Sequence, residues 1–208
     1  MLQIIPALLV AITVVIQCLA VQMSRYRLSR MNARPPHHGL ALMSGMLAAA
    51  AIILRLYQND SAVGVLFMTI MTGCMTLMTL TDAASCRLPR PFTIMYLISG
   101  SAFRLWQGDW LTGLCSAEFW FLLLLLFRQY TSYRRKTETI GLGDVFLIAG
   151  IAIWSPPGDI PWIVATAAGG ALVYLWCNRQ RRITRELPFG PFLCASQYAF
   201  TFYPGGLW

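Results

Sequence analysis

Residues 61–81 read SAVGVLFMTIMTGCMTLMTLT, a run of 21 residues without a charged side chain. A helix needs about 20 apolar residues to cross the hydrocarbon layer of a bilayer, so this stretch predicts a membrane-spanning helix. Further apolar segments lie at residues 2–23, 39–56, 92–105, 110–127, 142–155, 161–177 and 191–206. We therefore expect an all-α, polytopic membrane protein of about eight transmembrane helices, in one domain that spans residues 1–208.

The overall composition agrees with this fold class. Of the 208 residues 57% are hydrophobic and only 12% are charged, far from the average of soluble proteins. The first apolar segment has neither a basic region before it nor a small-residue cleavage site after it, so it is expected to be a retained helix and not a signal peptide.

Positive charge is concentrated in four of the connecting loops. Residues 24–38, 82–91, 128–143 and 178–190 hold four, two, four and four basic residues, which is 14 of the 16 in the chain. The positive-inside rule assigns these loops to the cytoplasm and both termini to the outside. The net charge of +8 follows from this topology, and no basic stripe continues beyond the loops, so the expected partner is the lipid bilayer and not a nucleic acid.

Two acids stand at the ends of apolar segments. Asp82 closes the third segment and Asp144 opens the sixth, and because these helices run in opposite directions, both acids are expected at the cytoplasmic membrane boundary. Two carboxyls at one depth can share a proton and hold a water between them, as an aspartic protease requires. Asp82 and Asp144 are the predicted catalytic residues, and Gly141 and Gly143 are predicted to let a substrate backbone approach closely.

A structural alternative exists for each acid taken alone. Acids at helix ends are common, and the helix dipole favours Asp144 in a first turn without any catalytic role. The same dipole argument assigns Asp144 as the base and Asp82, near a helix C-terminus, as the partner that carries the proton. Glu118 lies within an apolar segment and is expected to turn toward the bundle interior and bond to a neighbouring helix.

Neither the cysteines nor the histidines predict a metal site. The six cysteines form no CxxC pair, and His37 and His38 are adjacent with no third ligand nearby in sequence. We expect no metal and no other cofactor, with the cysteines serving as packing residues.

Three motifs resemble, in order, those of the type IV prepilin peptidase family. They are DAASCRLPRPFT at residues 82–93, GLGDVFLIAGIAIW at 141–154 and LPFGPFLCAS at 187–196. The resemblance implies a membrane-embedded aspartyl endopeptidase of the bacterial inner membrane, which cuts the basic leader from prepilins or pseudopilins on the cytoplasmic side. The family's catalytic aspartates correspond to Asp82 and Asp144, Pro89 is an expected substrate contact, and residues 188–192 are expected to shape the site or to begin the last helix.

The chain departs from the family pattern in two ways. Many members carry a large loop with two CxxC pairs and an N-methyltransferase activity, whereas residues 24–38 form a short loop without cysteine. The resemblance therefore implies a short form with peptidase activity and puts methylation in doubt. Phe146 and Arg90 also stand where the family often has a lysine and an acid.

Two other functions fit parts of the sequence. A presenilin-type intramembrane protease also uses Gly-x-Gly-Asp, but the Tyr-Asp and Pro-Ala-Leu signatures of that class are absent. The alternative from a different class is a small proton- or ion-coupled transporter, or a pilus-assembly subunit, that uses Asp82 and Asp144 for ions.

Overall fold

The computed structural model describes residues 4–31, 38–57, 61–135, 140–178 and 187–202. Each predicted apolar segment folds into one helix, and no strand occurs in these ranges. The helices are α1 (Ile4–Arg30), α2 (His38–Tyr57), α3 (Ala62–Ser85), α4 (Arg90–Gln107), α5 (Trp110–Arg135), α6 (Leu142–Trp154), α7 (Ile160–Cys177) and α8 (Gly190–Phe202).

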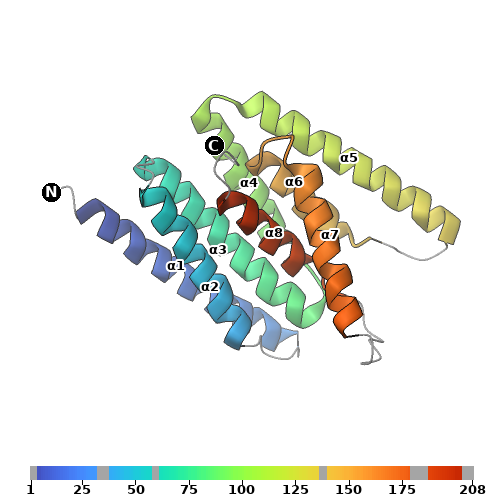
Figure 1. The fold of residues 1–208 in the computed structure, drawn as a ribbon, viewed down its shortest axis with the longest axis horizontal. Helices are drawn as coiled ribbons and strands as arrows, with labels where there is room; N and C mark the ends of the chain where they lie inside the picture. The colour runs from blue at the N-terminus through green and yellow to red at the C-terminus, as the bar shows by residue number, and fades with distance from the viewer. Residues whose placement is uncertain (1–3, 32–37, 58–60, 136–139, 179–186, 203–208) are drawn as a thin grey trace.

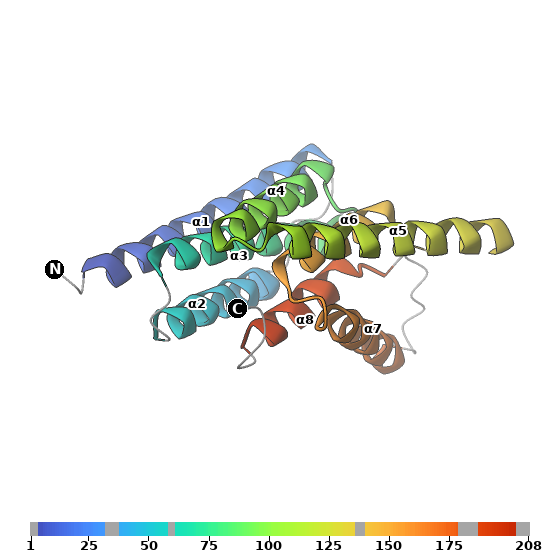
Figure 2. The ribbon, with the colours of Figure 1, turned by 90° about the horizontal axis from the view of Figure 1, so that it is seen from above.

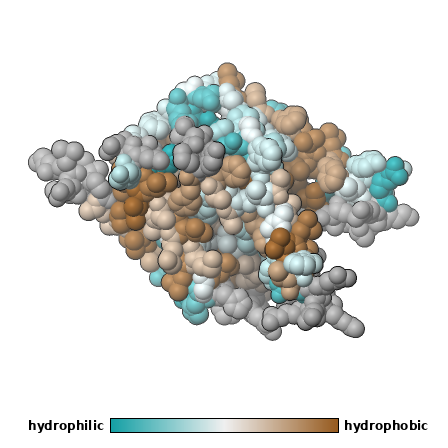
Figure 3. All heavy atoms as spheres, viewed as in Figure 1, coloured by the Kyte–Doolittle hydropathy of each residue, from teal (hydrophilic) through white to brown (hydrophobic). Residues whose placement is uncertain are grey.

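The helices confirm an all-α, polytopic membrane protein. Among the described residues, five helices are long and apolar enough to cross a bilayer, namely α1, α2, α3, α5 and α7. Helix α6 has only 13 residues and is shorter than a full span. Figure 3 shows hydrophobic side chains over much of the visible face, as expected of a surface that lipid covers.

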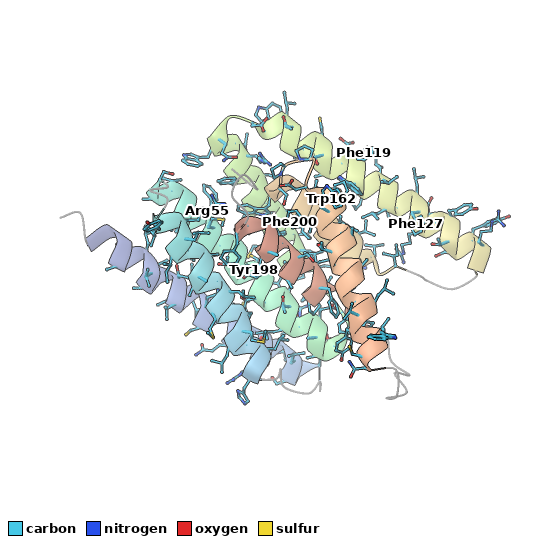
Figure 4. All side chains as sticks on the ribbon, in the orientation of Figure 1. Arg55, Phe119, Phe127, Trp162, Tyr198 and Phe200 are labelled. Carbon is cyan, nitrogen blue, oxygen red and sulfur yellow. The ribbon has the colours of Figure 1, made fainter. Side chains whose placement is uncertain are left out.

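Helix α3 is the centre of the bundle. It packs against α1, α2, α4 and α8 (Figure 1), and its lining of buried methionines fills the core. Its threonines bond to other helices, since Thr69 Oγ1 lies 3.2 Å from Thr13 Oγ1 and Gln17 Nε2 donates to Thr72 Oγ1. Tyr198 of α8, labelled in Figure 4, donates its hydroxyl to the Thr72 carbonyl oxygen at 3.2 Å. The uncharged segment at residues 61–81 is thus mostly buried by neighbouring helices.

Helix α6 is held in register by aromatic packing against α4. The Trp154 ring stacks on the rings of Tyr96 and Phe103, and Trp154 Nε1 donates to the Tyr96 carbonyl oxygen at 3.1 Å. Gly150 leaves space for the Tyr96 ring, because a Cβ at this position would lie 2.6 Å from it. Tyr96 also donates its hydroxyl to Gln197 Oε1 at 2.6 Å, which joins α4 to α8.

The far end of α6 is capped by a buried arginine. Arg104 of α4 donates from Nε to the Ile153 carbonyl oxygen at 2.7 Å and from Nη2 to the Ser155 carbonyl oxygen at 3.0 Å. These carbonyls have no partner within the helix, so the guanidinium satisfies groups that a helix C-terminus leaves open. The aromatic stack and this cap set the axial position of α6, and with it the position of Asp144 at the opposite end.

Candidate active site

Asp82 is a buried carboxyl in the last turn of α3. The helix ends at Ser85, where Cys86 takes a left-handed conformation with φ of 50° and its N–H caps the Asp82 carbonyl oxygen at 2.7 Å. The side chain of Asp82 is 4% exposed. A buried carboxyl needs hydrogen-bond donors, so its partners decide how it is held.

The partner of Asp82 comes from the start of α8, 108 residues further along the chain. The backbone N–H of Gly190 donates to Asp82 Oδ2 at 2.9 Å. Gly190 is the first residue of α8, so its N–H has no acceptor within the helix. The next residue, Pro191, has no N–H, and the following N–H of Phe192 bonds to the Phe189 carbonyl oxygen at 3.1 Å. One free donor therefore points from the helix N-terminus at the carboxyl.

Gly190 also has to be a glycine for this contact. A Cβ built on it would lie 2.8 Å from Asp82 Oδ2, closer than real Cβ contacts allow. Of the segment at residues 188–192, Gly190 begins α8, as expected of a proline-glycine helix start, and its N–H contacts Asp82.

Asp144 lies in the first turn of α6 and is half-buried. Gly141 is the N-cap residue, and its carbonyl oxygen accepts the N–H of Asp144 at 3.1 Å. A Cβ on Gly141 would lie 3.1 Å from Asp144 Oδ2, and a Cβ on Gly143 would lie 2.8 Å from the Leu88 Cβ. Gly143 therefore admits Leu88 of the loop after α3, whereas the exposed Gly141 leaves the backbone open beside the carboxyl.

The two aspartates meet in space although 62 residues separate them. Both line a cavity of about 710 Å³ that extends between α5, α6 and α7, and both line a smaller cavity of about 280 Å³ near the loop after α3. Burial, and after it the nearby charge of Asp82, raise the pKa of Asp144 to about 7. The arrangement can hold a water and a peptide bond between two carboxyls of which only one is readily ionised.

The three other predicted site residues, Gly141, Gly143 and Pro89, do not all line the same cavities. Gly141 lines both cavities, and Gly143 lines the smaller one together with Arg90 and Phe146. Pro89 lines neither, because it is the N-cap residue of α4 and borders a separate cavity of about 350 Å³ beside α1. The structure therefore brings four of the five predicted site residues together and leaves Pro89 apart.

The expectation for Glu118 is corrected. Its side chain is exposed and lines an apolar groove across α4, α5 and α6 that does not include either aspartate. Helix α5 lies at the edge of the bundle, so a residue in its middle can face outward while the helix packs on α6. Within the described part of the chain, no hydrogen bond joins Glu118 to a neighbouring helix.

The described residues contain no group of three histidine, cysteine, aspartate or glutamate side chains that could hold a metal ion. His38 begins α2, where Arg25 Nη2 lies 3.2 Å from its Nδ1, and His37 lies outside the described residues. No disulfide joins cysteines in the described part of the chain, and Cys86 borders both cavities that contain the aspartates.

Sequence reasoning missed the contact between Gly190 and Asp82 and the clamp of Arg104 on α6. The first left a signal, since Gly-Pro at a helix start leaves an unpaired N–H that needs an acceptor. The contact of Arg104 with α6 left no sequence signal, because Arg104 looks like any basic residue at a helix end.

Comparison with known proteins gives a consistent set of relatives. The model of the type IV leader peptidase family matches residues 69–176, which include both aspartates. The prepilin leader peptidase/N-methyltransferases of two Burkholderia pseudomallei strains, 1026b and K96243, are each 31% identical over 174 residues, covering 79% of this chain and 53% of the relative. Leader peptidase HopD of Escherichia coli is 35% identical over 75 residues, 33% of this chain and 48% of that protein. The chain spans about half the length of these relatives. No solved structure matches.

Proposed function

The chain belongs to the type IV leader peptidase family, and we propose that it is an aspartic endopeptidase with Asp82 and Asp144 as its catalytic residues. Its proposed substrates are type IV prepilins or pseudopilins, whose basic leader it removes at the cytoplasmic face of the bacterial inner membrane. The observation that carries this proposal is the pair of carboxyls, far apart in sequence, that line the same two cavities.

The proposed reaction needs only the two carboxyls and a water. One carboxylate removes a proton from the water as its oxygen bonds to the carbonyl carbon, and the other carboxyl gives its proton to the carbonyl oxygen. The tetrahedral intermediate then collapses and the C–N bond breaks, as the first carboxyl passes its proton to the leaving nitrogen and one hydroxyl of the intermediate returns a proton to the second carboxylate. Leader and mature protein leave with one water added across the bond.

We assign the base role to Asp82. The Gly190 N–H and the N-terminus of α8 stabilise negative charge on its carboxylate. Asp144 is then the carboxyl that carries the proton before the reaction, since no described donor bonds to its side chain. This assignment exchanges the roles expected from the ends of α3 and α6 alone, because α8 adds a second helix terminus next to Asp82.

Gly141 is the proposed contact for the substrate backbone. It is exposed, it lines both cavities, and it has no side chain to keep a peptide away from Asp144. Gly143 is proposed to act indirectly, since Leu88 fills the space beside it. Pro89 would act on substrate only through the separate cavity that it borders.

The proposal includes leader cleavage and not methyl transfer. The two Burkholderia relatives are named as N-methyltransferases as well as peptidases. The loop that carries cysteine pairs in many family members corresponds here to residues 24–38, which hold no cysteine. Purified protein is therefore expected to leave the new N-terminus of the mature product unmethylated.

The test is cleavage of a purified prepilin, read by mass spectrometry of the mature N-terminus. Asp82→Asn and Asp144→Asn should each abolish cleavage while the protein still accumulates in the membrane, and the double variant should be no worse than either one. Asp159→Asn is the matched control, because Asp159 makes no side-chain cap bond at the start of α7. Substantial cleavage by either single variant, or ion-dependent transport without cleavage, would overturn the proposal.

A further inference from the structure

Helices α5 and α7 both pack on α6 but do not contact each other within the described residues. The two helices diverge toward their C-terminal ends, and this divergence is visible in both ribbon views (Figures 1 and 2). Asp144 stands in the first turn of α6. It lines the larger of the two cavities described above, as do residues of α5 and α7.

The larger cavity lies between α5 and α7, beside α6. Its volume of about 710 Å³ lies within the roughly 300–1,000 Å³ that is typical of substrate sites. One wall is Leu124 and Phe127 of α5 and the opposite wall is Val164 of α7, with Ile148 of α6 between them. We call this space the α5–α7 cleft.

The α5–α7 cleft has both polar and apolar lining residues. The carboxyls of Asp82 and Asp144 and the exposed Gly141 line it. Most of its other lining residues are Leu, Ile, Val and Phe, and those on α5 and α7 belong to helices long and apolar enough to cross a bilayer. A chain segment that enters between these walls from lipid must satisfy its own backbone hydrogen bonds, and a single segment does so only as a helix.

We propose that the α5–α7 cleft receives, sideways from the bilayer, the first turns of an apolar helix that follows the scissile bond in the substrate. The proposal rests on the proposed function and adds how the substrate reaches the carboxyls. The helix lies against α5, α6 and α7, and its N-terminal end extends into the cavity so that the preceding peptide bond lies between Asp82 and Asp144.

Other occupants fit the cleft less well. A lipid acyl chain matches the apolar lining but offers no polar group to the two carboxyls. The groove that contains Glu118 is apolar too, but it lies across α4, α5 and α6 and does not reach either aspartate. A substrate whose apolar helix begins beside a polar, extended segment matches both the apolar lining and the two carboxyls.

Phe127 and Val164 allow the proposal to be tested with matched neighbours. Phe127, labelled in Figure 4, is 52% exposed and borders the cavity, whereas the adjacent Leu126 is 64% exposed and does not. Val164 borders the cavity, whereas the adjacent Ala165 is exposed and does not. Each pair lies on one helix at nearly the same depth and differs mainly in direction.

The first experiment is site-specific photo-crosslinking. Benzoylphenylalanine replaces Phe127 or Val164, or Leu126 or Ala165 as controls, in the Asp144→Asn chain so that bound substrate is not cut. With a prepilin that carries its apolar helix, Phe127 and Val164 should label residues in the first two turns after the scissile bond, at least tenfold more than the controls. Equal labelling from all four positions, or labelling of lipid or of a second copy alone, would overturn the proposal.

The second experiment separates binding from chemistry. Val164→Trp narrows the cleft and should raise the KM for the helix-bearing prepilin about tenfold, equivalent to about 1.4 kcal/mol, with kcat nearly unchanged. Ala165→Trp should change neither constant. Val164→Trp should impair cleavage of the prepilin more than cleavage of a short soluble peptide around the scissile bond that lacks the apolar helix, and an equal loss on both substrates would contradict the proposal.

The outcomes distinguish this inference from the proposed function. If the wild type cuts neither substrate, the proposed function fails and the inference fails with it. If the wild type cuts the prepilin but the two cleft positions do not label it, or Val164→Trp leaves its KM unchanged, only the α5–α7 cleft is wrong.

Discussion

The hydrogen bond from Gly190 to Asp82 makes the most demanding prediction. In Gly190→Ala the backbone N–H stays, but the new Cβ would lie 2.8 Å from Asp82 Oδ2. That is about 0.6 Å short of the 3.4 Å at which ordinary contact begins. Asp82 is buried at the end of α3 and cannot move into solvent, so its carboxyl must turn or α8 must shift.

The expected loss of rate follows from this displacement. A misplacement of about 1 Å at a catalytic group can cost roughly a hundredfold in rate. For a shift of about 0.6 Å we expect kcat to fall between about tenfold and a hundredfold, or about 1.4–2.7 kcal/mol of transition-state free energy.

The expected loss of stability is smaller. Overpacking costs about 1–3 kcal/mol, and replacing a helical glycine by alanine returns about 0.5–1 kcal/mol. The net change of about 1 kcal/mol corresponds to roughly 2–4 °C in melting temperature for a chain of this size. The variant should therefore stay folded while it loses activity.

The assay is the initial rate of prepilin cleavage beside a thermal melt in the same detergent. Gly169→Ala in α7 is the control, since a Cβ there meets nothing within 4 Å, and it should keep the wild-type rate. Cleavage by Gly190→Ala within threefold of wild type would show that Gly190 does not position Asp82.

Three further outcomes are expected. Arg104→Met should lower the free energy of unfolding by about 3 kcal/mol, because the Ile153 and Ser155 carbonyl oxygens lose their charged donor. The control Arg134→Met, at the exposed end of α5, should change the free energy of unfolding little, and thermal melts in detergent compare the two variants. Glu118→Gln should keep most of the cleavage rate and the same pH optimum, since its groove does not reach the aspartates, and a pH–rate profile shifted by a full unit would contradict this. Incubation with EDTA or phenanthroline should leave the cleavage rate unchanged, because the proposed reaction activates water with carboxylates alone, and inhibition that zinc reverses would show a missed metal site.

Much of the fold follows from the sequence because a bilayer restricts what an apolar segment can form. Within hydrocarbon a chain must satisfy its own backbone, so each long apolar run becomes a helix with little dependence on the rest of the protein. The eight predicted segments agree with the eight helices of the described residues for this reason. The orientation with both termini outside depends on loop charge relative to a membrane and stays a prediction.

The pairing of Asp82 with Asp144 was also within reach of the sequence. Each acid ends or begins an apolar run, so helix direction alone assigns both to one depth. The sequence could not say which helices are neighbours, because apolar faces of similar composition can pack in many orders. For this reason the orientation expected for Glu118 was wrong. An acid in an apolar run was expected to face the bundle interior, but α5 lies at the edge of the bundle and Glu118 is exposed.

The sequence by itself determined that the chain is a helical membrane protein and predicted two aspartates at one depth, because both inferences depend on local hydrophobicity and helix direction. Only the tertiary structure decided that Gly190 donates to Asp82, that Leu88 fills the space beside Gly143, and that the described residues of α5 and α7 pack on α6 without contacting each other. These contacts join residues that are distant in the chain, and they depend on steric fit between helices, which no single segment encodes.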